Sequence, residues 1–157
     1  MSQFLIALSV WLHALGTVVL IGHYLLLALI YLPAFTKTQA NISGPILSEI
    51  SKRSRPWMYA SLLIFIVTGT YLMLIDPGYL GFMDFGNLWG ILMLVKHILI
   101  LGMIALGFWF NAILRVGPMM SSNNSAEQAI SRFRSYSTLM AISGVIVLLL
   151  TAFAQIE

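Results

Sequence analysis

The sequence predicts an all-α integral membrane protein, a bundle of four transmembrane helices, from two observations. Of its 157 residues, 60% are hydrophobic and only 8% are charged, whereas a soluble domain carries roughly 25% charged residues. The apolar residues also fall into four runs, each long enough to cross the hydrocarbon core of a bilayer, and polar segments separate these runs. We therefore expect a single transmembrane domain over residues 1–157 that contacts the lipid bilayer.

The four predicted helices span about residues 4–32, 57–75, 88–114 and 136–154. We expect Pro33 to end the first helix, because a residue before proline avoids the helical conformation. That first run is too long for a signal-peptide core and no positive residue precedes it, so a retained helix is predicted. Residues 37–55 are expected to form a polar connection with a short interfacial helix over 46–52. Asp76-Pro77-Gly78 predicts a turn after the second helix.

The positive residues predict how the bundle is oriented. All lysines and arginines except Lys96 lie in the first and third connections: Lys37, Lys52, Arg53, Arg55, Arg115, Arg132 and Arg134. Short loops rich in these residues stay in the cytoplasm. We therefore expect a multi-pass protein of the plasma (inner) membrane with both termini on the extracytoplasmic side.

Composition excludes several classes of function. The positive residues form no basic stripe, so a nucleic-acid partner is not expected. The absence of cysteine excludes disulfides, iron–sulfur clusters, thiolate metal sites and covalently attached c-type haem. No aspartate or glutamate lies in the four predicted spans, which argues against a carboxylate proton relay and against hydrolysis by an acid–base pair.

The ionisable residues inside the predicted spans are His13, His23, Lys96 and His97. Charged residues in the hydrocarbon are costly, about 2.5–3.5 kcal/mol each on insertion scales, so these four are the candidates for function. His13 follows the start of its span by nine residues, and His97 follows the start of its own span by nine. The two imidazoles should lie at one depth in the outer half, as the ligands of a six-coordinate haem iron or of another metal would.

His23 lies in the inner half, where no other histidine shares its depth. It could bind a second haem alone, hydrogen-bond a quinone, or satisfy a backbone carbonyl of the second span. Lys96 could extend its amine to Asp84 or to a lipid phosphate, or pair with a haem propionate. Gly16 would allow either a flat macrocycle or a neighbouring helix to approach closely.

A copper site is the alternative to haem. Met93 precedes His97 by four residues and shares its helix face. Thioether and imidazole together suit monovalent copper. The candidate metal ligands are therefore His13, His23, His97 and Met93.

Several short motifs carry a resemblance to a known family. The chain resembles the copper-resistance protein D family in Trp11-Leu12-His13-Ala14-Leu15-Gly16-Thr17-Val18, Gly22, Leu32-Pro33, Thr68-Gly69, Lys96, Leu106-Gly107 and Asn111. It is also similar to the four-helix bacterial protoporphyrinogen oxidases, whose histidine in the first helix and lysine in the third would match His13 and Lys96. The resemblance implies either copper uptake from the periplasm or haem and porphyrin chemistry. His23 and His97 lie outside this pattern, and the basic residue that follows the first helix in the oxidases is missing near Pro33.

The first hypothesis is a b-type haem protein that transfers electrons between quinol and a partner, with one haem b or two. His13 and His97 would hold the iron, and Lys96 would meet a propionate. The second is a copper-handling permease in which His13, Met93 and His97 capture the ion and His23 receives it. The third is a cofactor-binding subunit, in a homo-oligomer or a larger membrane complex. The remaining alternative is that the histidines bind no cofactor and only form contacts between helices.

Overall fold

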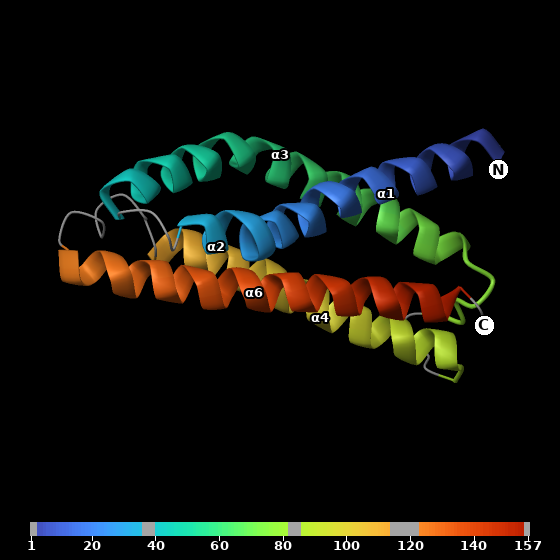
Figure 1. The fold of residues 1–157 in the computed structure, drawn as a ribbon. Coiled ribbons are helices and arrows are strands. Elements are labelled where there is room, and N and C mark those ends of the chain that lie inside the picture. Colours follow the sequence, from blue (N-terminus) through green and yellow to red (C-terminus); the bar gives the residue numbers. More distant parts are fainter. Residues whose placement is uncertain (1–2, 36–39, 82–85, 114–122, 156–157) are drawn as a thin grey trace.

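The computed structural model describes residues 3–35, 40–81, 86–113 and 123–155, with side chains for 3–35, 45–81, 86–109 and 131–155. Within these residues every regular element is helical (Figure 1). Four helical stretches are long and apolar enough to cross a membrane: Gln3–Phe35, Pro45–Ile75, Leu88–Trp109 and Ser131–Ala154. The prediction of an all-α protein with four apolar helices is therefore confirmed.

The first helical stretch does not end at Pro33, and that prediction was wrong. It consists of α1 (Gln3–Leu26), a π-helical turn η1 (Leu27–Tyr31) and α2 (Leu32–Phe35). At the end of η1 the Leu32 N–H donates to the Leu27 carbonyl, five residues earlier. Proline lacks an N–H and its ring crowds the carbonyl four residues earlier. The wider π turn just before Pro33 relieves this crowding, so the helix continues.

Two helices begin earlier than predicted. The second, α3, covers Ala40–Ile75, with Pro45 and Pro56 inside it, so residues 40–56 are helical instead of forming a polar connection. An ion pair at i,i+4 spacing, Arg53 Nε to Glu49 Oε1 at 2.8 Å, stabilises this polar part. The fourth, α6, covers Asn123–Ala154, whereas α4, Leu88–Ile113, has nearly the predicted bounds. In both α3 and α6 the helix therefore extends beyond its apolar run into a polar segment.

The predicted turn after Ile75 is confirmed. The Gly78 N–H donates to Asp76 Oδ1 at 2.9 Å, and the Tyr79 N–H donates to the Asp76 carbonyl at 3.1 Å. Asn87 then caps α4, since its Oδ1 accepts from the Gly90 N–H at 2.8 Å and its Nδ2 donates to the Gly78 carbonyl at 2.8 Å. The side chain of Asn87 thus joins the end of one helix to the start of the next.

Both ends of the described chain lie at the same end of the bundle as the Asp76 turn (Figure 1). We call this the termini end, and we call the other end, where α2 stops and α3 and α6 begin, the opposite end. Lys52, Arg53 and Arg55, predicted to lie in a connection, lie within α3, in its half nearer the opposite end. Lys37, Asp84 and Arg115 lie outside the described residues, as does the side chain of Asn111.

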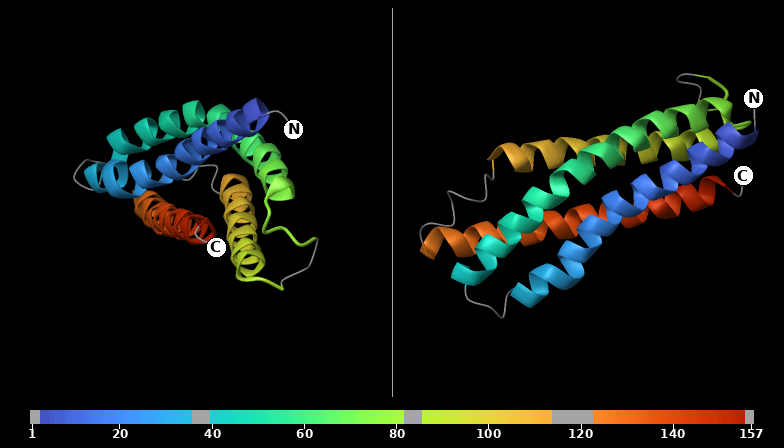
Figure 2. Two further views of the ribbon diagram at one scale, coloured as in Figure 1. Left: turned by 90° about the vertical axis from the view of Figure 1, so that its right-hand side faces the viewer. Right: turned by 90° about the horizontal axis from the view of Figure 1, so that it is seen from above.

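The helices pack unevenly. α1 packs closely on α3 and α6, while α4 packs mainly on α6 and lies apart from α1 (Figure 2). A β-carbon placed at the buried Gly16 of α1 would lie 3.2 Å from the Ser61 carbonyl oxygen of α3, so glycine permits this close contact. Large apolar side chains are exposed on all four helices, as expected for helices that contact lipid.

The α1–α3 contact predicts the effect of one substitution. Gly16→Leu should destabilise the protein by about 1–3 kcal/mol, because the new side chain would force the two helices apart. Gly22→Leu on the same helix is the matched control, since nothing lies within 4 Å of a β-carbon placed there. Thermal unfolding of both variants in detergent checks this, and equal stabilities would contradict the packing.

Candidate functional site

His13 is held against α3 by a hydrogen bond and by ring packing. Its Nδ1 lies 3.0 Å from Thr68 Oγ1, and its ring stacks on Phe65 with centroids 4.3 Å apart and planes at 24°. A β-carbon placed at Gly69 would lie 3.0 Å from His13 Cε1. These contacts hold the imidazole in place, and a β-carbon at position 69 would require the ring to shift by a few tenths of an ångström.

The hydrogen bonds of Thr68 decide which nitrogen of His13 carries a proton. The Thr68 hydroxyl donates its only proton to the Ile64 carbonyl at 2.6 Å. Its oxygen can therefore only accept from His13, which makes Nδ1 the protonated nitrogen. Among the described residues none bonds to the Nε2 lone pair of neutral His13, an arrangement also found in histidines that bind a metal.

His97 has the same arrangement on α4. Its Nδ1 lies 2.6 Å from the Met93 carbonyl oxygen, one helical turn earlier. A carbonyl can only accept, so Nδ1 is again the donor and Nε2 is again free. This contact uses the Met93 backbone and not its thioether, so the predicted pairing of the Met93 thioether with His97 stays a prediction.

The structure does not bring His13 and His97 into contact. His13 lies in the α1–α3 contact, whereas His97 is exposed on α4, and these two helices do not pack closely. No group of three or more histidine, aspartate or glutamate side chains able to hold a metal occurs among the described residues. A site that uses both histidines therefore requires α4 to approach α1 and α3.

Lys96 adjoins His97 on α4 and is half-buried. Within the described side chains the one ion pair joins Arg53 and Glu49, so no described carboxylate neutralises Lys96. Asp84, the predicted partner, lies outside the described residues.

Gly16 serves helix packing in this structure, because the backbone of α3 fills the space beside it. Of the two roles predicted for this glycine, the close approach of a neighbouring helix is thus observed. Gly16 lies one helical turn after His13 and helps to set how closely α1 and α3 approach there.

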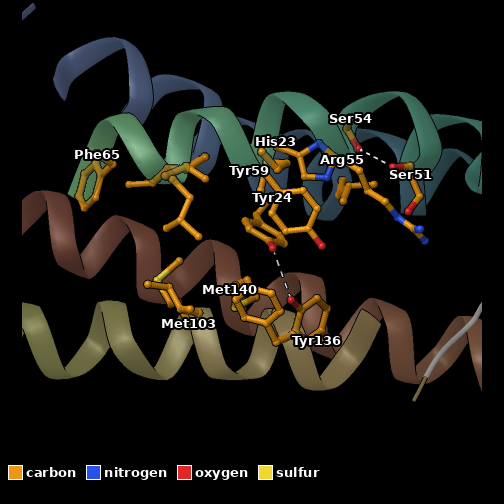
Figure 3. A pocket seen from close by; sticks show the side chains of 18 of the residues that line it. His23, Tyr24, Ser51, Ser54, Arg55, Tyr59, Phe65, Met103, Tyr136 and Met140 are labelled. Atoms are coloured by element: carbon orange, nitrogen blue, oxygen red, sulfur yellow. Dashed lines mark hydrogen bonds between the residues drawn. The ribbon is translucent and has the colours of Figure 1, made fainter. Parts of the chain in front are cut away.

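A second group of polar residues surrounds a pocket that all four helices line (Figure 3). The pocket is open to its surroundings, and its atom-free space of about 1230 Å³ includes open space outside the protein. His23, Tyr24 and Tyr136 lie along its middle, and the two tyrosine hydroxyl oxygens are 3.4 Å apart. Phe65 lines one end and Arg55 the other. The rest of the lining is mostly aliphatic, aromatic and methionine side chains.

His23 is in this pocket and not at the depth of His13. Its ring makes an edge contact with Tyr24, with centroids 5.4 Å apart. Within the described chain no hydrogen bond is made by the His23 ring, so the predicted bond to a carbonyl of the second span is not seen. His23 is therefore available to a ligand in the pocket.

Comparisons with family models, with curated protein sequences and with solved structures found no match to this chain. The resemblance to the copper-resistance protein D family and to the protoporphyrinogen oxidases stays a prediction from sequence motifs. The candidate site must therefore be judged by its own chemistry.

Sequence reasoning missed the residues that hold the candidates. Thr68 and Gly69 contributed only to the family resemblance, although they position His13. The sequence does not single out Tyr24, and it predicts for Tyr136 only a place at the inner membrane interface, where tyrosine is common. A threonine in the interior of a predicted span was the one signal that could have indicated a hydrogen bond between helices.

The hydrogen bonds predict the protonation of each histidine. In nitrogen NMR spectra of histidine-labelled protein, neutral His13 and His97 should carry their proton on Nδ1. Thr68→Val should remove this preference at His13 and leave His97 unchanged, because only His13 loses its acceptor. Thr151→Val is the control, since Thr151 makes the same bond to a carbonyl four residues earlier, at 2.8 Å, with no histidine beside it. An Nε2-protonated His13 in the unaltered protein would contradict the assignment.

Proposed function

We propose that this chain is a membrane-embedded b-type haem protein that transfers electrons, in which His13 and His97 would hold one haem. The observation that carries the proposal is the shared arrangement of these two imidazoles. Each donates Nδ1–H to an oxygen acceptor and leaves Nε2 free, as haem and metal ligation require. Haem iron would supply a one-electron redox centre in the apolar interior.

Lys96 supports haem over a bare metal ion. An amine in an apolar span needs an anionic partner, and none is found among the described side chains. The propionate groups of haem are carboxylates attached to a flat apolar ring. Lys96 adjoins His97 on α4, so a haem bound at His97 could place a carboxylate beside the amine. A bare metal ion brings no such carboxylate.

The proposal requires α4 to move towards α1 and α3 when the cofactor binds. The loose attachment of α4 supports such a movement, since α4 packs closely on α6 alone among the described helices. Binding free energy would then be used to complete the bundle around the ring. Ligation of the iron by His97 is the interaction that would hold α4 in place.

We place the protein in the plasma (inner) membrane, and the positions of the positive residues support one orientation there. The opposite end, with Lys52, Arg53 and Arg55, would face the cytoplasm, and the termini end would face outward. His13 and His97 would then lie in the outer half of the membrane. Redox partners at the outer surface could reach the haem edge from that side.

The visible spectrum tests the proposal. Protein purified in detergent after expression with added haem precursor should show a sharp Soret band and, on reduction with dithionite, the split bands of six-coordinate haem. His13→Ala and His97→Ala should each abolish the six-coordinate spectrum, while His23→Ala should keep it. Thr68→Val should weaken haem binding by about 10–100-fold, because the second hydrogen-bond shell orients the ligand.

Thr151→Val is the matched control for Thr68→Val and should leave the spectrum unchanged. A six-coordinate spectrum that persists in both His13→Ala and His97→Ala would disprove the ligand assignment. A colourless protein that binds copper through His13, Met93 and His97 would instead support the copper permease. A spectrum that develops only in a complex with another chain would indicate the cofactor-binding subunit.

A further inference from the structure

We propose that the pocket around His23 binds the head group of a lipid-soluble 1,4-quinone. The inference deepens the proposed electron-transfer function, on which it rests, by naming the chemical class of the redox partner. The pocket extends from Phe65, beside His13, towards Arg55. His23 follows His13 by ten residues, or about 15 Å along the helix axis. The haem ligands and this pocket are therefore two separate sites.

The surroundings of His23 favour hydrogen bonding over metal ligation. His13 and His97 each have one nitrogen fixed by an oxygen acceptor, whereas the His23 ring has no such partner among the described residues. A neutral imidazole without a partner offers one N–H donor and one lone pair. It can therefore donate to a quinone carbonyl and accept from the hydroxyl of the reduced quinol.

The tyrosine pair supplies the second polar contact. The hydroxyl oxygens of Tyr24 on α1 and Tyr136 on α6 are 3.4 Å apart, a long hydrogen bond for two hydroxyl groups. A hydroxyl can donate and accept, so either tyrosine suits both redox forms of a quinone. A 1,4-quinone has an oxygen at each end of a flat ring. His23 and Tyr24 on α1 and Tyr136 on α6 place polar groups around an apolar space, as such a ring requires (Figure 3).

Gly107 of α4 keeps the space beside these hydroxyls open. A β-carbon placed there would lie 3.6 Å from the Tyr136 hydroxyl and 3.9 Å from the Tyr24 hydroxyl. A longer side chain at this position would therefore occupy the place where a head group meets the tyrosines. Among the glycines of α4, Gly102 has nothing within 4 Å of such a β-carbon and does not line the pocket.

The quinone tail can leave the pocket between α3 and α4. These helices are not closely packed, and where they meet Tyr59 stacks on Phe108 with ring centroids 6.2 Å apart. Both rings line the pocket and both are about half exposed, at 49% and 54%. A lipid-soluble molecule could therefore enter from the bilayer between two aromatic side chains.

Phe65 connects the pocket to the proposed haem ligand. Its ring lines the end of the pocket away from Arg55, and it also stacks on His13 at 4.3 Å. A quinone in the pocket would thus be separated from the His13 imidazole by one aromatic ring. Electrons could pass between the two sites without leaving the apolar interior.

The charges of the pocket distinguish a quinone from other lipid-soluble ligands. Its described lining contains no carboxylate, so a cationic ligand has no partner there. Arg55 is its one described cation, and it lies at the end of the pocket away from Phe65. A phosphate head group would be attracted to Arg55 at that end, whereas the middle of the pocket, with His23 and the two tyrosines, carries no fixed charge. Neutral donors around an apolar space suit the uncharged oxygens of a quinone.

Direct binding tests this inference without requiring haem. The affinity of the full-length protein in detergent is measured by equilibrium dialysis for a 1,4-naphthoquinone that carries a short saturated alkyl chain. We expect saturable binding that Gly107→Leu abolishes and Gly102→Leu retains. Tyr136→Phe and His23→Ala should each raise the Kd about tenfold, as expected for the loss of one hydrogen bond.

Gly107→Ala, which adds only contacts of ordinary length, replaces Gly107→Leu if the larger variant does not fold, and it should still weaken binding. Equal affinities in the Gly107 and Gly102 variants, or displacement of the quinone by an anionic phospholipid, would overturn the inference. The haem spectrum is recorded on the same preparations. Quinone binding without that spectrum would reject the haem proposal alone, and the spectrum without quinone binding would reject this inference alone.

Discussion

The organisation of the candidate site depends on the single proton of the Thr68 hydroxyl. Because that proton goes to the Ile64 carbonyl, the Thr68 oxygen must accept, and His13 must donate from Nδ1. The bond joins two helices in an apolar region, where water cannot replace a lost partner. It also requires close contact between α1 and α3, which Gly16 and Gly69 allow at two levels. The close packing of α1 on α3 thus also determines which nitrogen of His13 carries the proton.

The three histidines differ in the hydrogen bonds around them, although each lies in an apolar helix. His13 and His97 each have one nitrogen fixed by an oxygen of the protein, which prepares the other nitrogen for a metal. His23 has no such partner among the described residues and lies beside a tyrosine pair in a pocket. The same side chain is thus suited to ligation at one depth and to hydrogen bonding of an organic ligand at another. Phe65 touches both regions, so under the proposed function its ring would lie between the haem ligand and the quinone.

The uneven packing of the helices has a physical origin in their sequences. α1 has glycine where α3 approaches it at Ser61, and Gly144 of α6 lies where Ile21 of α1 packs. α4 has an open surface at Gly102, and it meets α3 through the rings of Phe108 and Tyr59. Small residues allow helices to approach closely, whereas large aromatic residues hold them apart. The pocket exists because α4 is held away from α1 and α3.

The sequence by itself determined the four apolar helices, the Asp76 turn and the ionisable residues that require an explanation, because hydrophobic length and local turn chemistry act over short stretches of chain. It could not predict that the helix continues through Pro33, which depends on a π turn, or that α3 and α6 begin so early. Only the tertiary structure decided that His13 bonds to Thr68, that His97 lies apart from it and that His23 lines a pocket with Tyr136. These partners lie on different helices, and their meeting depends on how each helix is rotated about its axis. That rotation is set by packing between helices, which no single stretch of sequence encodes.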